Sequence, residues 1–340
     1  MLRGRFLLNN KIYIYFACFH DTEVYPTIMD AIEQAENPQN LVFGIDFQYI
    51  QEQTMIDMKQ WLKQNPIVNA RVNYLKYTDD NFWEYVGLAK GRKRAYAMRE
   101  DEQYALLIDG HSKFGSNWDR KLIYKYELAK MRNIQKPIVH GYAGYYVLGP
   151  NRERVWHPKP YMRTIRYQYY QEYDPTNEDQ QTAKFKWHKR LPTFVITKAN
   201  PEGDELVPNV KFSGNFSFTE YDICEHLPDW VLFEDEEIPW SINLYDAGFS
   251  FVFPIFQDPV VAHLYMGTKE PYDVRLTRDN IEKYIPGNDL QGFLRKKDKN
   301  IDDFLNDPNN LEKILNYQYF ARVKILSGKT QENYIPDSFR

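Results

Sequence analysis

The feature that most constrains the fold is an alternation of strand-like and helix-like segments between residues 12 and 108. Four segments have the length and side chains of strands: 12–19 (IYIYFACF), 41–48 (LVFGIDFQ), 71–77 (RVNYLKY) and 104–108 (YALLI). The segments between them have apolar residues at helical spacing: 27–37, 55–64 and 82–98. The first strand is almost continuously apolar, as expected of a strand buried on both faces of a parallel sheet. The alternation predicts an α/β fold with a mostly parallel, doubly wound sheet.

Polar residues follow the ends of three of these predicted strands. They are His20 and Asp21, then Asp46 and Gln48, then the triplet Asp109-Gly110-His111. Ligands of doubly wound sheets bind in the crevice beyond the carboxyl ends of the strands. We therefore expect the functional site along this edge of the sheet.

The triplet Asp109-Gly110-His111 is the candidate with the clearest chemistry. A carboxylate and an imidazole separated by one residue can both face one metal ion at a strand end. Mixed oxygen and nitrogen ligands shift the preference of a site from Mg²⁺ toward Mn²⁺. The alternative is an aspartate that caps the following turn beside a histidine with an ordinary hydrogen bond.

The charge and composition of the chain limit the kinds of molecule that it is expected to bind. The net charge of −4 and the pI of about 6.0 argue against a strongly basic, sequence-independent grip on nucleic acid. The basic run 90–94 (KGRKR) is either a local basic patch or a solvated helix face. Aromatic residues make up 16% of the chain, which suits stacking on sugars or bases and suits an aromatic core equally well.

The expected compartment follows from cysteine usage and hydropathy. Cys18 and Cys224 are the two cysteines, so the chain has no disulfide framework and a reducing compartment is expected. Polar residues 9–11 interrupt the apolar N-terminus, and no small-residue cleavage site follows. The sequence contains no run of about 18 apolar residues, the length that a membrane-spanning helix needs. A cytoplasmic enzyme is the simplest interpretation.

A known family shares the segment around the triplet. YALLIDGHSKFGSNWD (104–119) resembles the signature of the polypeptide N-acetylglucosaminyltransferase-like family, which runs Tyr-x-x-x-Ile-Asp-Ser-His, two residues, Phe, then Trp-Asp. Gly110 stands where the family has serine, whereas Phe114, Trp118 and Asp119 fall in register. Upstream, Phe19-His20-Asp21 resembles the family's Tyr-Arg-Asp strand end, and Gly87 and Arg92 match a glycine and an arginine of the family in spacing.

The resemblance continues downstream. Residues 215–265 are similar to a second block of the family, in which an aromatic-rich strand precedes a Glu-Glu pair on a helix, a Gly-aromatic turn, a proline and His-x-Tyr. The matching residues are Glu236, Glu237, Gly248, Pro254, His263 and Tyr265. Residues 150–210 and the last 70 residues lie outside the resemblance.

This resemblance implies a fold and an activity. Family members have the A-type glycosyltransferase fold, a Rossmann-like, mostly parallel central sheet flanked by helices. They use a UDP-sugar donor with a divalent metal, Mn²⁺ or Mg²⁺, and retain the anomeric configuration. The metal neutralises the charge that develops on the diphosphate leaving group. By resemblance the donor is UDP-N-acetylglucosamine.

The resemblance also implies roles for single residues. Asp109 and His111 would hold the metal and the diphosphate, and His263 would be the third ligand. For His263 alone, the alternative is a buried histidine bonded to the backbone. Arg92 is a candidate for the diphosphate or a sugar hydroxyl, because a guanidinium matches phosphate geometry. Its alternative is a solvated cation.

Further candidates concern the nucleoside and the transferred sugar. Asp21 and Asp46, with Phe19, are candidate contacts of the donor nucleoside, with turn capping as the alternative for the two aspartates. The family places Glu236 and Glu237 over the acceptor and the donor sugar, whereas a solvated helix start would also favour carboxylates. Glu237 is preferred because it shares a helical stripe with Trp240, Ser241 and Leu244.

The expected organisation is a catalytic domain at 1–270 and a mainly helical C-terminal extension at 271–340. Residues 150–210 read as an insertion of loops and short strands that forms the acceptor region. The acceptor hydroxyl could belong to a protein, a glycan or a modified nucleobase. Two other hypotheses are a non-catalytic sugar-nucleotide or carbohydrate binding module, and a hydrolase that activates water on the same metal.

Overall fold

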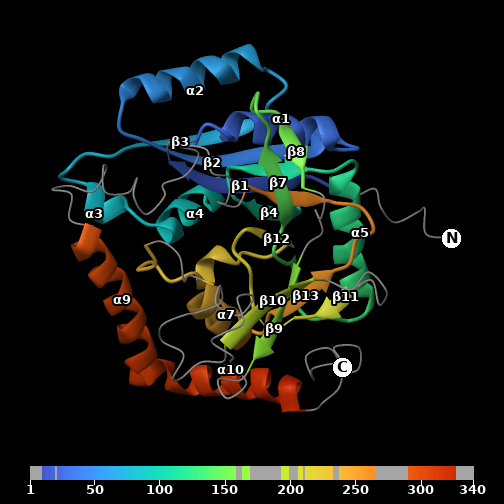
Figure 1. Cartoon of the computed structure of the whole chain (residues 1–340), viewed down its shortest axis with the longest axis vertical. Helices are drawn as coiled ribbons and strands as arrows, with labels where there is room; N and C mark the ends of the chain where they lie inside the picture. Colours follow the sequence, from blue (N-terminus) through green and yellow to red (C-terminus); the bar gives the residue numbers. More distant parts are fainter. Residues whose placement is uncertain are drawn as a thin grey trace.

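The computed structural model describes residues 10–19, 21–157, 163–168, 193–198, 206–209, 211–232, 237–264 and 290–326. Its centre is a large mixed sheet with the strand order β11-β13-β6-β12-β4-β1-β2-β3 (Figure 1). Four neighbouring strands run parallel: β3 (Ala70–Lys76), β2 (Leu41–Tyr49), β1 (Ile12–Phe19) and β4 (Tyr104–Ile108). The mostly parallel α/β architecture predicted from the sequence is confirmed.

The other half of the large sheet contains the antiparallel strands. β12 (Phe216–Thr219) is antiparallel to both β4 and β6 (Pro137–His140), so β6 runs in the same direction as β4. β13 (Ser250–Pro254) is parallel to β6, and β11 (Leu206–Pro208) is antiparallel at the edge. The carboxyl ends of β1, β4 and β6 therefore lie along one edge of the sheet.

Helices cover both faces of the sheet. One core joins alternate residues of β1, beginning with Ile12, to α1 (Val24–Gln34), α2 (Glu52–Gln64) and α5 (Trp118–Met131). The intervening residues of β1, Tyr13 and Tyr15, face a second core. That core contains α4 (Leu88–Tyr96), α7 (Glu237–Asp246), α9 (Leu290–Asn306) and α10 (Pro308–Leu326). This layering explains why β1 and β2 read as nearly continuous apolar runs.

The segment 82–98, expected as one helix, forms two. α3 (Phe82–Tyr85) ends before Gly87, which has φ of +131°, and α4 follows. A Cβ on Gly87 would lie 2.8 Å from the backbone oxygen of Val231, so the glycine permits both the turn and the close approach. The turn directs α4, and with it Arg92, toward the sheet edge.

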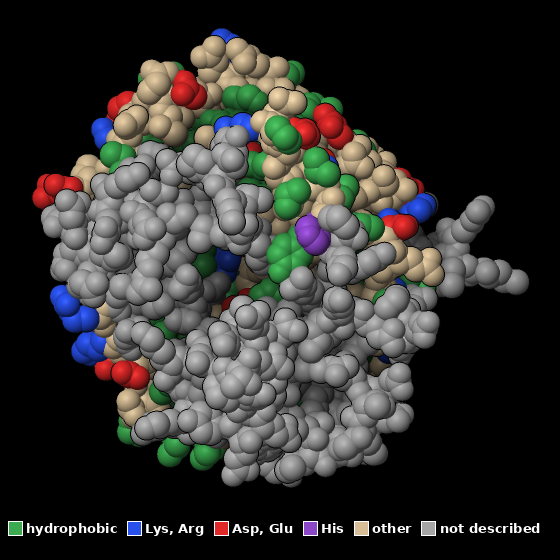
Figure 2. All heavy atoms as spheres, viewed as in Figure 1, with side chains coloured by type: hydrophobic (Ala, Val, Ile, Leu, Met, Phe, Trp, Pro, Cys, Tyr) green, Lys and Arg blue, Asp and Glu red, His purple; other side chains and the backbone are tan. Residues whose placement is uncertain are grey.

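A second, smaller sheet has the order β5-β14-β7-β8. Its strands are β5 (Ser112–Phe114), β14 (Val261–His263), β7 (Gly144–Leu148) and β8 (Arg154–Trp156). β5 begins three residues after Asp109, so this sheet starts at the carboxyl end of β4. Val155 on β8 is exposed, and Figure 2 shows hydrophobic side chains at the surface in the region of β7 and β8.

The insertion and the C-terminal extension are described in part. β9 (Arg163–Gln168) and β10 (Thr193–Lys198) form an antiparallel pair, in agreement with the short strands expected within 150–210. α9 and α10 give the last part of the chain the expected helical character and run along the outside of the molecule in Figure 1. The ring of Phe320 on α10 stacks on Tyr245 of α7 at 4.4 Å. Among the helices of the described ranges, none is both long and apolar enough to cross a bilayer.

Candidate metal and donor site

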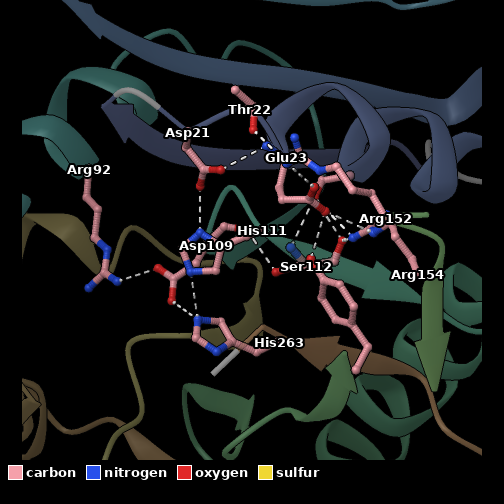
Figure 3. Close-up of polar contacts among 12 residues, drawn as sticks. Asp21, Thr22, Glu23, Arg92, Asp109, His111, Ser112, Arg152, Arg154 and His263 are labelled. Atoms are coloured by element: carbon pink, nitrogen blue, oxygen red, sulfur yellow. Dashed lines mark hydrogen bonds and ion pairs between the residues drawn. The ribbon is translucent and has the colours of Figure 1, made fainter. Parts of the chain in front are cut away.

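The candidate site lies at the point where the order of the parallel strands changes direction. β1 and β4 are parallel neighbours, and the chain leaves them on opposite sides of the sheet, from β1 toward β2 and from β4 toward β6. Asp21 follows β1, and Asp109 and His111 follow β4, so their side chains converge at this edge (Figure 3). This is the position at which doubly wound sheets bind ligands.

Asp109, His111 and His263 form a compact trio. One potential ligand atom from each lies within 4.8 Å of the others. Nε2 of His263 is 2.9 Å from Oδ2 of Asp109 and 3.1 Å from Nε2 of His111. His263 comes from β14 of the small sheet, where it pairs with Ser112 in register. The structure thus brings together the three residues predicted as metal ligands.

The hydrogen bonds of the trio fit a metal ion. Nδ1 of His111 is 2.6 Å from Oδ2 of Asp21, which assigns the proton to Nδ1 and leaves the lone pair of Nε2 directed at His263. The two facing Nε2 atoms can share one proton at most if both rings are neutral, and a cation can take the place of that proton. One carboxylate oxygen with two imidazole nitrogens suits Mn²⁺ or a similar divalent ion. A carboxylate behind a ligating histidine is a common support of such sites.

Asp109 is a carboxylate at neutral pH. Its burial opposes ionisation, but the hydrogen bond from His263 and the charge of Arg92 outweigh that effect and hold the pKa of Asp109 well below its usual range. Nη2 of Arg92 lies 3.2 Å from Oδ1 of Asp109, and the buried guanidinium also lies 5.8 Å from the ring centroid of Trp240. Arg92 is therefore not part of a solvated helix face.

The nucleoside candidates occupy the neighbouring strand ends. Asp46 is fully buried, and Arg94 grips both of its oxygens at 2.9 and 2.8 Å. Gln48 and Asn73 donate to the same carboxylate at 2.7 and 2.6 Å. Through this network Asp46 holds Gln48, Asn73 and Arg94 in place. A direct contact between Asp46 and the nucleoside stays a prediction. Phe19 meets Tyr77 edge to face at 5.4 Å beside it.

Glu237 lies at the first residue of α7 and is gripped by a buried lysine. Its carboxylate accepts from Nζ of Lys211, from the hydroxyl of Tyr142 and, at 3.1 Å, from the backbone N–H of Gly214. The Lys211 and Glu237 side chains are 2% and 14% exposed. Tyr142 follows the carboxyl end of β6, so this cluster shares the sheet edge of the metal trio.

Sequence reasoning missed Lys211 and Tyr142. Neither residue belongs to a motif, and their partner is distant along the chain, so no local signal identifies them. Three residues named from the family resemblance, His20, Glu236 and Tyr265, lie outside the described residues.

Comparison with known proteins agrees with this geometry. The family model described as Glycosyltransferase (GlcNAc) matches residues 85–314. This chain belongs to that glycosyltransferase family. The match includes the trio, Arg92 and Glu237, and confirms the family resemblance of the sequence motifs. A search of curated proteins finds no match.

Solved structures of glycosyltransferases are also similar to the chain. GalNAc-T7 with UDP, GalNAc and Mn²⁺ is 14% identical with a TM-score of 0.48, over 81% of this chain and 47% of that one, so this chain spans about half of its length. The mannosyltransferase PcManGT of Pyrobaculum calidifontis with GDP-Man and Mn²⁺ is 10% identical with a TM-score of 0.40, over 94% and 76% of the two chains. S. aureus TarS 1-349 is 8% identical with a TM-score of 0.40, over 94% and 75%.

Proposed function

We propose that this protein transfers a sugar from a nucleotide-sugar donor to a hydroxyl acceptor with the help of a divalent metal. The observation that carries the proposal is the convergence of Asp109, His111 and His263 at the carboxyl edge of the sheet of a glycosyltransferase family member. By family resemblance the donor is UDP-N-acetylglucosamine and the anomeric configuration is retained. Mn²⁺ is the preferred metal because the ligand set mixes oxygen and nitrogen.

The residues of the trio would hold the metal, which supplies positive charge to the diphosphate leaving group. Asp21 fixes the ring of His111 through its hydrogen bond to Nδ1. Arg92 lies beside Asp109, so its planar guanidinium can donate to a phosphate oxygen or a sugar hydroxyl at the same place. The metal ion and the Arg92 guanidinium would both favour departure of the nucleoside diphosphate, because their positive charge stabilises the negative charge that develops on it in the transition state.

Glu237 is proposed to orient the sugar or the acceptor by hydrogen bonding. The carboxylate accepts hydrogen bonds from Lys211, Tyr142 and the backbone of Gly214, and these contacts fix its position. Its fixed position suits an acceptor of hydrogen bonds from hydroxyl groups. In a retaining transfer the incoming hydroxyl approaches on the side of the leaving group, so a strong enzymic base is not required.

The acceptor is proposed to bind along residues 150–210. A protein, a glycan and a modified nucleobase remain the candidate acceptors. We also propose the domain organisation of 1–270 and 271–340 and a cytoplasmic location, as the sequence suggests.

Release of UDP from purified protein tests the proposal. The protein would be incubated with a panel of UDP-sugars, with Mn²⁺ or with chelator, and with candidate acceptors. We expect Mn²⁺-dependent UDP release that is lost in Asp109→Ala, His111→Ala and His263→Ala, and kept in His226→Ala, a histidine outside the trio. Donor binding without any turnover would support a binding module instead. Donor hydrolysis that no acceptor outpaces would support a hydrolase.

A further inference from the structure

Arg154, at the start of β8, turns into the molecule. Its side chain is 10% exposed. The guanidinium donates to the carbonyl oxygen of Ser112 and, at 2.9 Å, to that of Pro26, and it lies 4.6 Å from the ring centroid of Tyr146. The interleaved cations and aromatics of 150–210 suggest acceptor contacts from the sequence alone. The contacts of Arg154 instead join it to the loop that follows β4 and to the start of α1.

Ser112 connects Arg154 to the metal trio. It directly follows His111, and its hydroxyl donates to the backbone oxygen of Asp109 at 2.8 Å. In the small sheet it pairs in register with His263. The carbonyl held by Arg154 therefore belongs to a residue that contacts or adjoins all three members of the trio.

Glu23 connects Arg154 to the same site from the other side. The buried carboxylate of Glu23 lies 3.4 Å from Nε of Arg154 and accepts from the hydroxyl of Tyr146 at 3.2 Å. The backbone N–H of Glu23 donates to Oδ1 of Asp21 at 2.9 Å, while the other oxygen of Asp21 holds His111. Figure 3 shows both routes, from Arg154 through Ser112 and from Arg154 through Glu23, ending at the trio.

We propose that Arg154 is a positioning residue of the metal site, which fastens the loops after β1 and β4 to each other from behind. A guanidinium suits this task because its donors have a fixed planar arrangement and can bind a carboxylate and carbonyl groups together. Ligands must be held within about 0.5 Å of their productive geometry to bind a metal tightly. Loss of the guanidinium would let the loops after β1 and β4 shift independently, and the distances between the ligand atoms of the trio would increase. This inference rests on the metal site of the proposed function.

Arg152 provides a matched control. It lies two residues before Arg154, in the turn that leads into β8, and its guanidinium is also close to the carboxylate of Glu23, at 3.7 Å. Its side chain is 47% exposed, and it donates to the hydroxyl of Thr22 at 3.3 Å. Arg152 thus offers the same charge to the same carboxylate from the solvent side.

Titration of donor-free protein with Mn²⁺ tests the inference, with unbound Mn²⁺ followed by electron paramagnetic resonance. We expect Arg154→Met to raise the Kd for Mn²⁺ roughly tenfold, the lower end for residues that support metal ligands, and Arg152→Met to change it less than about twofold. Arg154→Lys keeps the charge beside Glu23 without the fork, so it should fold as the wild type does and still bind Mn²⁺ more weakly. This variant keeps the test valid if Arg154→Met fails to fold.

Two results would overturn the inference. One is a folded Arg154→Lys or Arg154→Met variant with the Kd of the wild type for Mn²⁺. The other is a raised acceptor KM at saturating Mn²⁺ with an unchanged Kd, since that would make Arg154 an acceptor contact. A wild-type protein that binds no Mn²⁺ would instead refute the proposed metal site itself, and the two failures are therefore distinguishable.

Discussion

Replacement of Lys211 by methionine tests how Glu237 is held. Nζ of Lys211 contacts the carboxylate of Glu237, donates to the hydroxyl of Tyr142 at 3.0 Å and lies 5.6 Å from the centroid of its ring. Because the pair is almost inaccessible, the substitution leaves a carboxylate without its cation in a place that water hardly reaches. Breaking a buried pair in this way costs about 3–5 kcal/mol. The N–H of Gly214 and the hydroxyl of Tyr142 still bind Glu237, so we expect the lower end, about 3 kcal/mol.

Urea denaturation followed by tryptophan fluorescence measures this free energy of unfolding. The double variant Lys211→Met/Glu237→Gln removes the unpaired charge, so it should be more stable than Lys211→Met alone. Lys93→Met is the control, because Lys93 pairs with Asp229 at the surface, where such pairs contribute about 0–1 kcal/mol. A loss below about 1 kcal/mol in Lys211→Met, or costs that simply add in the double variant, would refute the argument from burial.

Three further predictions follow from single contacts. Asp21→Asn should weaken Mn²⁺ binding about 10- to 100-fold, because it removes the carboxylate behind His111; calorimetric titration measures this, and an unchanged affinity would separate Asp21 from the site. Burial and the charge of Lys211 lower the pKa of His140 to about 3. Since the unfolded chain takes up this proton near pH 6.5, stability falls as the pH drops below that value, by about 1.4 kcal/mol at pH 5.5. His140→Phe should remove that part of the difference between unfolding at pH 7.5 and pH 5.5, and an identical pH dependence would contradict it. Gly91→Ala should destabilise by about 1–3 kcal/mol in thermal unfolding, because its Cβ would lie 2.7 Å from both Ala17 Cβ and Gln48 Nε2, and unaltered stability would show that α4 can shift.

The predictable part of the fold is the part with local signals. β1, β2 and β4 are buried on both faces, so their sequences are almost continuously apolar. The position of Asp109 and His111 follows from the rule that ligands bind at strand ends. That His263 lies beside Asp109 and His111 could be predicted only from the family resemblance, because no spacing or periodicity in the sequence relates His263 to β4.

The unpredicted part depends on contacts between distant segments. β5, β7 and β14 are short and owe their pairing to the strands beside them, which leaves a weak local pattern. The division of 82–98 at Gly87 reflects a close approach to Val231, far away in the sequence. Arg154 and Lys211 look like solvated cations in the sequence, and only their burial against distant carboxylates distinguishes them.

The origin of the trio has a consequence for biogenesis. His111 and His263 are 152 positions apart, and His111 lies in the turn between β4 and β5, so the metal pocket exists only after β14 has docked beside β5. A chain emerging from the ribosome would display Asp109 and His111 long before it could capture a cation with all three side chains. Binding of Mn²⁺ would then favour the completed assembly of the two sheets over partly assembled forms. Metal supply during synthesis would thus affect the yield of mature protein as well as its turnover.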